Sequence, residues 1–218
     1  RNLYERSCDV RWWATDAAAV ACAAEPSEAH RLHAQRRLGQ ILDSYTVYAD
    51  LVLVGRDGHV LANGRPQQFA SAGADVSQAD WFRQALASAD GSEFGFAAEP
   101  VCALVGGKHV LVYSCAVRRG GDVHGEVVGV LGILFDWDAL AKTIVRRTPL
   151  TQDEWARTRV CIVDGDGRVL ADSAEHQEAQ LEMNGWKHLL GQARGSVVTR
   201  LHGHTLCIAH AASPGYET

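Results

Sequence analysis

Histidine pairs are the first residues in this sequence whose spacing suits chemistry, in this case the coordination of a metal ion. His202 and His204 are spaced for one face of a strand, and His30 and His33 lie within one turn of a predicted helix. Neither pair has an identifiable third or fourth ligand close in the sequence. The other histidines are scattered over predicted loops and helices. We therefore expect neither a metal site nor a cofactor.

Cysteine chemistry is the second possibility. The six cysteines lie far apart with no C-x-x-C pair, which argues against a zinc cluster, a thioredoxin-like redox site and covalent haem. Most of them fall inside apolar runs, where a small buried side chain is the ordinary role of cysteine. The chain also lacks the G-x-S-x-G, H-E-x-x-H, P-loop and G-x-G-x-x-G motifs. We expect no catalytic residues, and a small enzyme that uses Cys102 or Cys115 is kept as an alternative.

Aromatic side chains beside a cation suit the binding of a small molecule. Trp81 and Phe82 open a predicted helix and Arg83 follows them, so a ring could stack on a ligand and the guanidinium could hold an anion. Phe96 and Tyr113 lie on predicted strands of the same region. Each of these residues also has an ordinary structural interpretation, namely core packing for the rings and solvent exposure for the arginine.

An internal repeat predicts the elements that must position these side chains. Residues 51–63, LVLVGRDGHVLAN, align without gaps to residues 160–172, VCIVDGDGRVLAD, at an offset of 109 with six identities in thirteen positions. Each copy has an apolar run, a turn that carries Asp-Gly and a second apolar run. Asp-Gly accepts the positive φ of a tight primed turn, so both copies are predicted to be β-hairpins.

The similarity continues beyond the hairpins. DWFRQALAS at 80–88 matches GWKHLLGQA at 185–193 as a short helix, and KHVLVYSCAV at 108–117 matches GHTLCIAHAA at 203–212 as a strand. In the first copy a second hairpin and the strand EVVGVLGILFD complete a sheet of about five strands. The second copy reaches only a fourth strand. Two related modules are therefore predicted, each an antiparallel sheet with flanking helices.

The predicted fold class is α+β, with a long N-terminal helix followed by two PAS-like modules. Apolar residues recur near a 3.6 period in the N-terminal segment, with a break near Pro26 and a cap at Ser27. A second helical connector is interrupted at Pro149. The predicted boundaries are 1–44 for the helix, 45–137 for the first module, 138–157 for the connector and 158–218 for the second module.

Composition excludes two classes of partner. Lys+Arg number 21 against 26 Asp+Glu, a net charge of -5, and the basic residues are scattered, so we expect no nucleic-acid partner. The longest apolar run, 127–135, is too short to span a bilayer. The chain has no Met at position 1 and its second module stops short, so we expect a segment of a longer protein.

The order of these elements resembles the double Cache (dCache) sensory domains, the extracytoplasmic ligand-binding parts of bacterial chemoreceptors, sensor histidine kinases and related receptors. The resemblance is based on the Trp81-Phe82 pair at a helix start, the strand VVGVLGILFD and the unequal second module, and it covers essentially the whole chain. The N-terminal stretch RNLYERSCDVRWWATD is similar to sequence just after the first transmembrane helix of some methyl-accepting chemotaxis proteins.

The resemblance implies a periplasmic sensor without chemistry of its own. It implies a membrane-distal first module that binds a small organic ligand, a membrane-proximal second module, and a homodimer through the N-terminal helix. Contact with the membrane is expected only through flanking spans. The apolar stripe of the first helix is the only feature of the residues themselves that supports the dimer.

The resemblance also implies which residues contact the ligand. Members that bind amino acids or amines carry an arginine two residues before the Trp and acidic anchors at two later positions; this chain has Ala79, Ala103 and Leu134 there. An ammonium group without carboxylates would lose solvation without recovery, so an amino acid or amine is not expected. An uncharged, aromatic or anionic ligand is predicted instead. The predicted site consists of Trp81, Phe82, Arg83, Phe96, Tyr113 and Leu134.

Two other functions stay open at this stage. A cytoplasmic PAS-like regulatory or dimerisation module would show similar copies, and a small cysteine-dependent enzyme could share the α+β fold. Apolar spans of about 20 residues on both sides of this segment in the full-length gene would support the receptor, and their absence would support either alternative.

Overall fold

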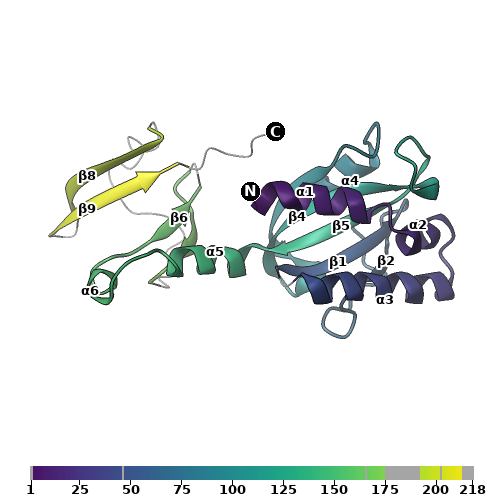
Figure 1. Ribbon diagram of the computed structural model, residues 1–218, viewed down its shortest axis with the longest axis horizontal. Coiled ribbons are helices and arrows are strands. Elements are labelled where there is room, and N and C mark those ends of the chain that lie inside the picture. Colours follow the sequence, from purple (N-terminus) through teal and green to yellow (C-terminus); the bar gives the residue numbers. More distant parts are fainter. Residues whose placement is uncertain (1, 46, 165, 175–191, 202, 213–218) are drawn as a thin grey trace. The chain divides into compact units, whose positions relative to one another are not determined.

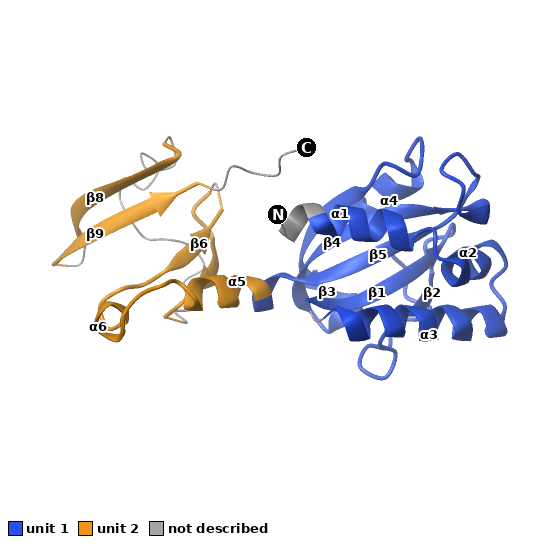
Figure 2. Ribbon diagram, in the orientation of Figure 1, with its two compact units in different colours: residues 1–139 blue, residues 140–218 orange. Residues whose placement is uncertain are grey.

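A computed structural model of the chain describes residues 2–45, 47–164, 166–174, 192–201 and 203–212. The chain divides into two compact units, residues 1–139 and residues 140–218 (Figure 2). The first unit contains the predicted N-terminal segment together with the first predicted module. The second unit contains most of the predicted connector and the second module. No helix among the described residues is long and apolar enough to cross a membrane.

The N-terminal segment forms three helices, α1 (Asn2–Trp13), α2 (Ala17–Ala24) and α3 (Glu28–Ser44) (Figure 1). The predicted break near Pro26 is confirmed, and Ser27 caps α3 by accepting a hydrogen bond of 3.2 Å from the His30 N–H. The prediction of one long helix is wrong because Asp16 begins a new helix. Its carboxylate accepts from the Ala18 N–H at 3.0 Å and pairs with Arg37 at 2.7 Å.

The first unit is built on one five-stranded antiparallel sheet, in agreement with the prediction of about five strands. Its strands follow the order β2-β1-β5-β4-β3. The bounds are β1 (Tyr48–Gly55), β2 (Val60–Asn63), β3 (Gly95–Cys102), β4 (Lys108–Arg118) and β5 (Val127–Asp136), with α4 (Asp80–Leu86) between β2 and β3. Short 3₁₀ turns cover Ala103–Val105 and Arg119–Gly121. The strand that comes last in the sequence of the first unit, β5, is therefore the central strand of this sheet.

Helices cover both faces of this sheet, and two glycines of β5 show which helix lies on which face. A Cβ atom at Gly129 would lie 3.0 Å from Cβ of Ala23 in α2, whereas one at Gly132 would lie 3.2 Å from Cζ3 of Trp81 in α4. Side chains alternate along a strand, so positions three apart point to opposite faces. The N-terminal helix α2 and the helix α4 therefore pack on opposite faces of β5.

The second unit carries two hairpins. Helix α5 (Trp137–Arg146) starts at the end of the first unit, and α6 (Gln152–Trp155) follows the predicted interruption at Pro149, with a capping box between Thr151 and Glu154. The strands are β6 (Cys161–Val163), β7 (Val169–Asp172), β8 (Arg194–Leu201) and β9 (His204–Ala211). Among the described residues they form two two-stranded sheets, β6-β7 and β8-β9. The predicted helix at 185–193 lies almost wholly outside the described residues.

The two repeated hairpins share their register residue for residue. In β1-β2 the pairs are Val52 with Asn63, Leu53 with Ala62 and Val54 with Val60, and in β6-β7 the paired positions are the same after a shift of 109. The register shifts after the second pair in both copies. The turn is longer than the predicted primed turn: Gly58 N–H donates to Gly55 C=O and Gly55 N–H to His59 C=O, with Gly58 at a φ of 85°.

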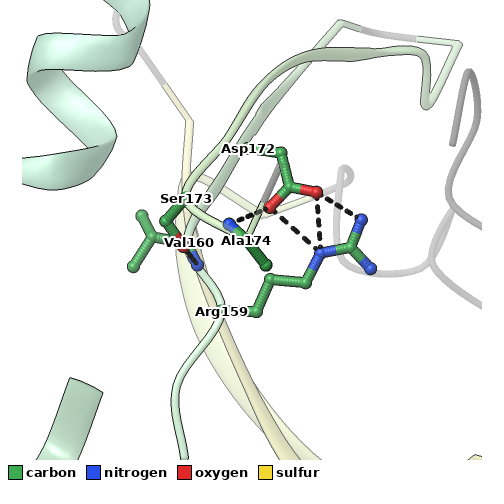
Figure 3. A network of polar contacts seen from close by, with 5 residues as sticks. All are labelled: Arg159, Val160, Asp172, Ser173 and Ala174. Carbon is green, nitrogen blue, oxygen red and sulfur yellow. Dashed lines mark hydrogen bonds and ion pairs between the residues drawn. The ribbon is translucent and has the colours of Figure 1, made fainter. Parts of the chain in front are cut away.

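Equivalent polar positions beside the two hairpins carry different chemistry. Asp50 in the first copy corresponds to Arg159 in the second, and Asn63 corresponds to Asp172. The Asn63 amide donates to the buried Asp50 carboxylate at 2.8 Å. The Arg159 guanidinium donates from Nη2 to Asp172 Oδ2 at 2.8 Å and from Nε to both carboxylate oxygens (Figure 3). The hydrogen-bonded pair Asp50–Asn63 of the first unit thus corresponds to the ion pair Arg159–Asp172 of the second.

Candidate functional site

Three of the six predicted site residues lie together on the α4 face of the sheet. Trp81 and Phe82 of α4 and Leu134 of β5 belong to one buried apolar cluster and expose 2% of their surface or less. The two aromatic rings meet edge to face with centroids 6.3 Å apart. Phe82 and Leu134 are therefore core residues, and Trp81 is both a core residue and, at one edge, part of a cavity described below.

Phe96 and Tyr113 lie on the opposite face. The register places Phe96 beside Tyr113 and Tyr113 beside Ile133, while Ala97, Val112 and Leu134 form the next row and point the other way. The rings of Phe96 and Tyr113 contact each other with centroids 5.0 Å apart. The sheet thus separates these two aromatic residues from Trp81, and the six predicted residues do not line one cavity.

Arg83 lies at the surface. Its guanidinium pairs with Asp80, one turn earlier in α4, at 2.6 Å, and both side chains are mostly exposed. A second cation of this region, Lys108, is also exposed and pairs with Asp136 at 3.2 Å. Neither side chain lines the cavity next to Trp81.

A cavity of about 300 Å³ opens beside Trp81. Its walls come from the segment before α4, from the end of β3 and from the loop after β3. Trp81, Ala79 and Ala103 all line it, so two of the three positions singled out by the family resemblance face the same space. The full lining is Ala74, Asp75, Val76, Gln78, Ala79, Trp81, Glu99, Val101, Cys102, Ala103 and Leu104.

Local hydrogen bonds shape the walls of this cavity. Asp75 accepts from the Ser77 N–H at 2.8 Å, which turns the chain into α4 and holds the pKa of the Asp75 carboxyl below its usual range. On the other side, Gly106 and Gly107 both have a positive φ, and the Gly107 N–H donates to Cys102 C=O at 2.9 Å. These two turns bring the ends of the 74–79 and 99–104 segments to one place.

The position of Trp81 is held from the sheet side as well. The buried Ser114 hydroxyl of β4 donates to the Trp81 carbonyl at 2.7 Å. A Cβ atom at Gly95 would lie 3.0 Å from the same carbonyl oxygen, so β3 passes α4 closely only because residue 95 is a glycine. The indole is therefore fixed before any ligand arrives.

The polar residues of the cavity are the ones that sequence reasoning missed. Asp75, Gln78 and Glu99 all line it, and within the described part of the chain no lysine or arginine does. Asp75 and Gln78 follow a turn-rich stretch in which nothing marks them as ligand contacts, and Glu99 lies mid-strand. The premise that this pocket lacks carboxylates is therefore wrong, because two carboxylates enter it from positions other than the expected ones.

The two cysteines considered as nucleophiles are unsuited to that role. Burial raises the pKa of the Cys102 thiol, and burial raises the pKa of the Cys115 thiol to about 11. The thiolate is the reactive form, so both side chains stay protonated at neutral pH. Cys115 contacts the Glu93 carbonyl at 3.5 Å and has no histidine beside it among its recorded contacts.

The histidine pairs do not form a metal site in the part of the chain that the structure describes, where no cluster of three or more His, Cys, Asp or Glu side chains occurs. His30 instead makes a hydrogen bond of 2.7 Å from Nδ1 to the Glu25 carbonyl. His202 lies outside the described residues.

Comparison with known proteins gives one family match. The profile of the Cache domain family, dCache_1, matches residues 15–217. No curated protein sequence matches the chain significantly.

Solved structures of low sequence identity share the fold. The sensory domain of the Campylobacter jejuni chemoreceptor Tlp3 (CcmL) has a TM-score of 0.63 and 17% identity, covering 96% of this chain and 85% of that one. The ligand-binding domain of the Pseudomonas fluorescens chemoreceptor CtaA, in complex with L-serine, has a TM-score of 0.51 and 20% identity, covering 93% and 78%.

The sensor domain of the V. cholerae histidine kinase DctB has a TM-score of 0.59 and 16% identity. That match covers 79% of this chain, which spans only 60% of the DctB chain.

Proposed function

Because the chain belongs to the Cache domain family, we propose that it senses a small organic molecule for a transmembrane receptor, most simply a chemotaxis receptor. Cache domains are sensory modules of membrane receptors, are typically periplasmic and are not enzymes. In this proposal the first unit is the membrane-distal, ligand-binding module and the second unit is membrane-proximal. The observation that carries the proposal is the cavity lined jointly by Trp81, Ala79 and Ala103.

The size and lining of the cavity fit a small ligand with an apolar part. Trp81, Val76, Val101 and Leu104 contribute apolar lining, while the polar groups are few. Such a mixture is typical of sites that bury the body of a ligand and orient it through one or two polar contacts. The ligand body would therefore lie between the 74–79 segment and the 99–104 segment, against Trp81.

The charges of the lining determine the preferred ligand class. Related chemoreceptor domains hold amino acids, such as isoleucine in Tlp3 and L-serine in CtaA. In this chain Ala79 stands where the resemblance places an arginine, and no lysine or arginine of the described residues lines the cavity. An α-carboxylate would therefore lie near Asp75 and Glu99 with no cation to pair with it. An uncharged or cationic ligand without a carboxylate suits the site. The proposal therefore drops the anionic ligand that the sequence predicted as one possibility.

The test compares amino acids with the amines that differ from them only by the missing carboxylate. We would titrate the protein with histidine and histamine, lysine and cadaverine, and arginine and agmatine by calorimetry, and follow the shift in thermal unfolding. Binding of at least one amine with at least about tenfold preference over its amino acid supports the ligand class. Tighter binding of the amino acids would reject it, and saturable binding of either kind would still support a sensor.

Site variants locate the binding. Glu99→Gln removes one carboxylate from the cavity, and Glu28→Gln is the matched control because Glu28 is exposed on α3 and does not line the cavity. The Glu99 variant should weaken amine binding by about tenfold while the control binds like the parent. Equal binding by all three proteins would place the ligand elsewhere.

The proposed homodimer rests on the N-terminal helices. The apolar stripe that suggested it is largely used inside the unit, because Val10, Trp13 and Leu38 are buried there. Trp12 remains 70% exposed and Leu32 is 43% exposed, so these two side chains are the apolar groups that a partner would cover. Sedimentation of Trp12→Ser against the parent protein tests this part of the proposal separately.

A further inference from the structure

A second cavity lies between α3 and the segment that follows β2. Its volume is about 390 Å³, and no residue lines both this cavity and the one beside Trp81. Its α3 wall is formed by residues at 35, 36, 39, 40 and 43, and its other wall by Gly64, Arg65 and Pro66. We call it the α3 groove. Neither the proposed function nor the sequence motifs use any of its residues.

The floor of the α3 groove is backbone. A Cβ atom at Gly39 would lie 3.1 Å from the Gly64 carbonyl oxygen, and one at Gly64 would lie 2.5 Å from Cδ1 of Leu42 and 3.1 Å from the Leu38 carbonyl carbon. The two glycines therefore let the backbones of the helix and the segment approach closely, with the Leu42 side chain packed against Gly64. The longer side chains on either side of this contact form the rim.

One rim residue, Arg65, is held in place by the sheet. Its Nη1 donates to the carbonyl oxygens of Tyr48 and Ala49 at 2.9 and 2.8 Å, and its backbone N–H donates to the buried Asp50 carboxylate at 3.1 Å. No carboxylate pairs with the Arg65 guanidinium among the ion pairs of the described residues. The fixed guanidinium keeps its charge and its other N–H groups for a further partner.

Arg36 supplies a second guanidinium from the helix. It is exposed, lines the groove and takes part in no ion pair of the described residues. The amides of Gln35 and Gln40 lie on the same wall. Asp43 is the only acid among the described residues of the lining, and seven residues of helix place its backbone about 10 Å from that of Arg36. The groove thus carries two cations against one anion.

We propose that the α3 groove binds a small soluble oxyanion, a carboxylate or a phosphate, between Arg36 and Arg65. A guanidinium presents N–H groups in a planar fork that matches both groups, and two such side chains line this groove, one of them held by the sheet carbonyls. Since α3 packs against β1 and β2, an anion there would tie the N-terminal helices to the sheet. This site is independent of the ligand proposed beside Trp81.

The experiment titrates inorganic phosphate and malonate at constant ionic strength. Arg36→Gln removes one fork, and Arg31→Gln is the matched control, since Arg31 is exposed on the same helix but does not line the groove. We expect saturable binding to the parent protein and to the Arg31 variant, and binding weaker by at least about tenfold in the Arg36 variant. Equal weakening in both variants, or the absence of saturable binding to the parent, would overturn the proposal.

Arg65→Lys provides a second test that keeps the charge near the sheet carbonyls. Loss of the planar fork should weaken phosphate binding by about tenfold while the thermal midpoint without ligand changes little. Unchanged binding in this variant would contradict the role given to Arg65. The Glu99→Gln variant should bind phosphate like the parent, which separates this site from the cavity beside Trp81.

Discussion

The indole of Trp81 lies directly against the backbone of Gly132. A Cβ atom at this glycine would lie 3.2 Å from Cζ3 of the indole, 3.5 Å from its Cη2 and 3.0 Å from Cγ2 of Val52. The ring therefore occupies the space that a side chain would need on the central strand of the sheet. The aromatic wall of the ligand cavity is set by a residue on β5 that does not itself line that cavity.

The first prediction concerns Gly132→Ala. The added methyl group must push the indole and Val52 aside by a few tenths of an ångström, and we expect a loss of about 1–2 kcal/mol in the free energy of unfolding. With 5-fluorotryptophan incorporated, the ¹⁹F resonance of Trp81 should shift. Gly129→Ala on the opposite face should also destabilise, but with a smaller shift of that resonance. A Gly132 variant with both the parent stability and the parent spectrum would contradict the contact.

The second prediction concerns Ala79→Arg. Ala79 precedes α4 in an extended conformation and lines the cavity, so an arginine there can supply the cation that the lining lacks. We expect the preference for an amine over the corresponding amino acid to fall by at least about tenfold in calorimetric titrations. Ala79→Gln is the control of similar reach without charge. A preference that is identical in the parent and in both variants would show that position 79 does not contact the ligand.

The third prediction concerns Asp50→Asn and pH. Burial raises the pKa of the Asp50 carboxyl, although hydrogen bonds from Asn63, Leu51, Arg65 and Gly64 partly oppose the shift. The folded protein then binds the proton more tightly than the unfolded chain, so the stability contributed by Asp50 is fully present below about pH 3.9 and declines as the pH rises through the raised pKa.

The advantage of the parent protein over Asp50→Asn should therefore widen as the pH falls from 7 toward 4. At pH 7 we expect the variant to be less stable by about 2 kcal/mol, because its amide group faces the Asn63 amide where a carboxylate oxygen accepted a hydrogen bond. Urea unfolding of both proteins at four pH values measures this. A difference that narrows toward acid would show that the sign is wrong.

The fourth prediction concerns Arg159→Met in the second unit. Burial alone would raise the pKa of Asp172, but hydrogen bonds from Arg159 and from the Ala174 N–H outweigh it and hold the pKa below its usual range. A lowered pKa means that the stabilisation is present above about pH 3.9 and is lost as the pH falls through the folded-state pKa. We expect a loss of about 1–2 kcal/mol at pH 7, since the Asp172 side chain is only 5% exposed.

Hydrogen exchange of the β6-β7 amides measures this effect within the second unit. The double variant Arg159→Asp with Asp172→Asn reproduces the side chains of Asp50 and Asn63 at the equivalent positions, and we expect it to recover part of the loss. Equal protection of these amides in the parent and in Arg159→Met at pH 7 would show that the Arg159–Asp172 ion pair does not stabilise the second unit.

The repeat and the buried strands could be predicted from the sequence because they depend on local signals. Asp-Gly at equivalent positions and alternating or continuous apolar runs predicted both hairpins and a first sheet of about five strands, but not the order of those strands in the sheet. The break at Asp16 was not predicted because alanine on both sides favours a continuous helix, and only the pairing of Asp16 with Arg37 shows why the chain turns there.

The site was less predictable because it depends on which face of the sheet each residue occupies. Phe96 and Trp81 both suit ligand binding by type, but the pairing of Phe96 with Tyr113 places it on the other face. Trp81→Ala is a poor test of ligand binding, because removing a ring that is 2% exposed costs about 3–5 kcal/mol of stability. Asp75 enters the cavity from a turn and Glu99 from the middle of β3, and neither position carries a motif.

The glycines on the two faces of β5 have a mechanical consequence. Because Gly129 and Gly132 have no side chains, Ala23 of α2 and the Trp81 indole of α4 each pack directly on the backbone of β5. A displacement of α4 on ligand binding would then be transmitted across the single strand β5 to α2. We expect a ligand at Trp81 to change the hydrogen exchange of α2 on the far side of the sheet.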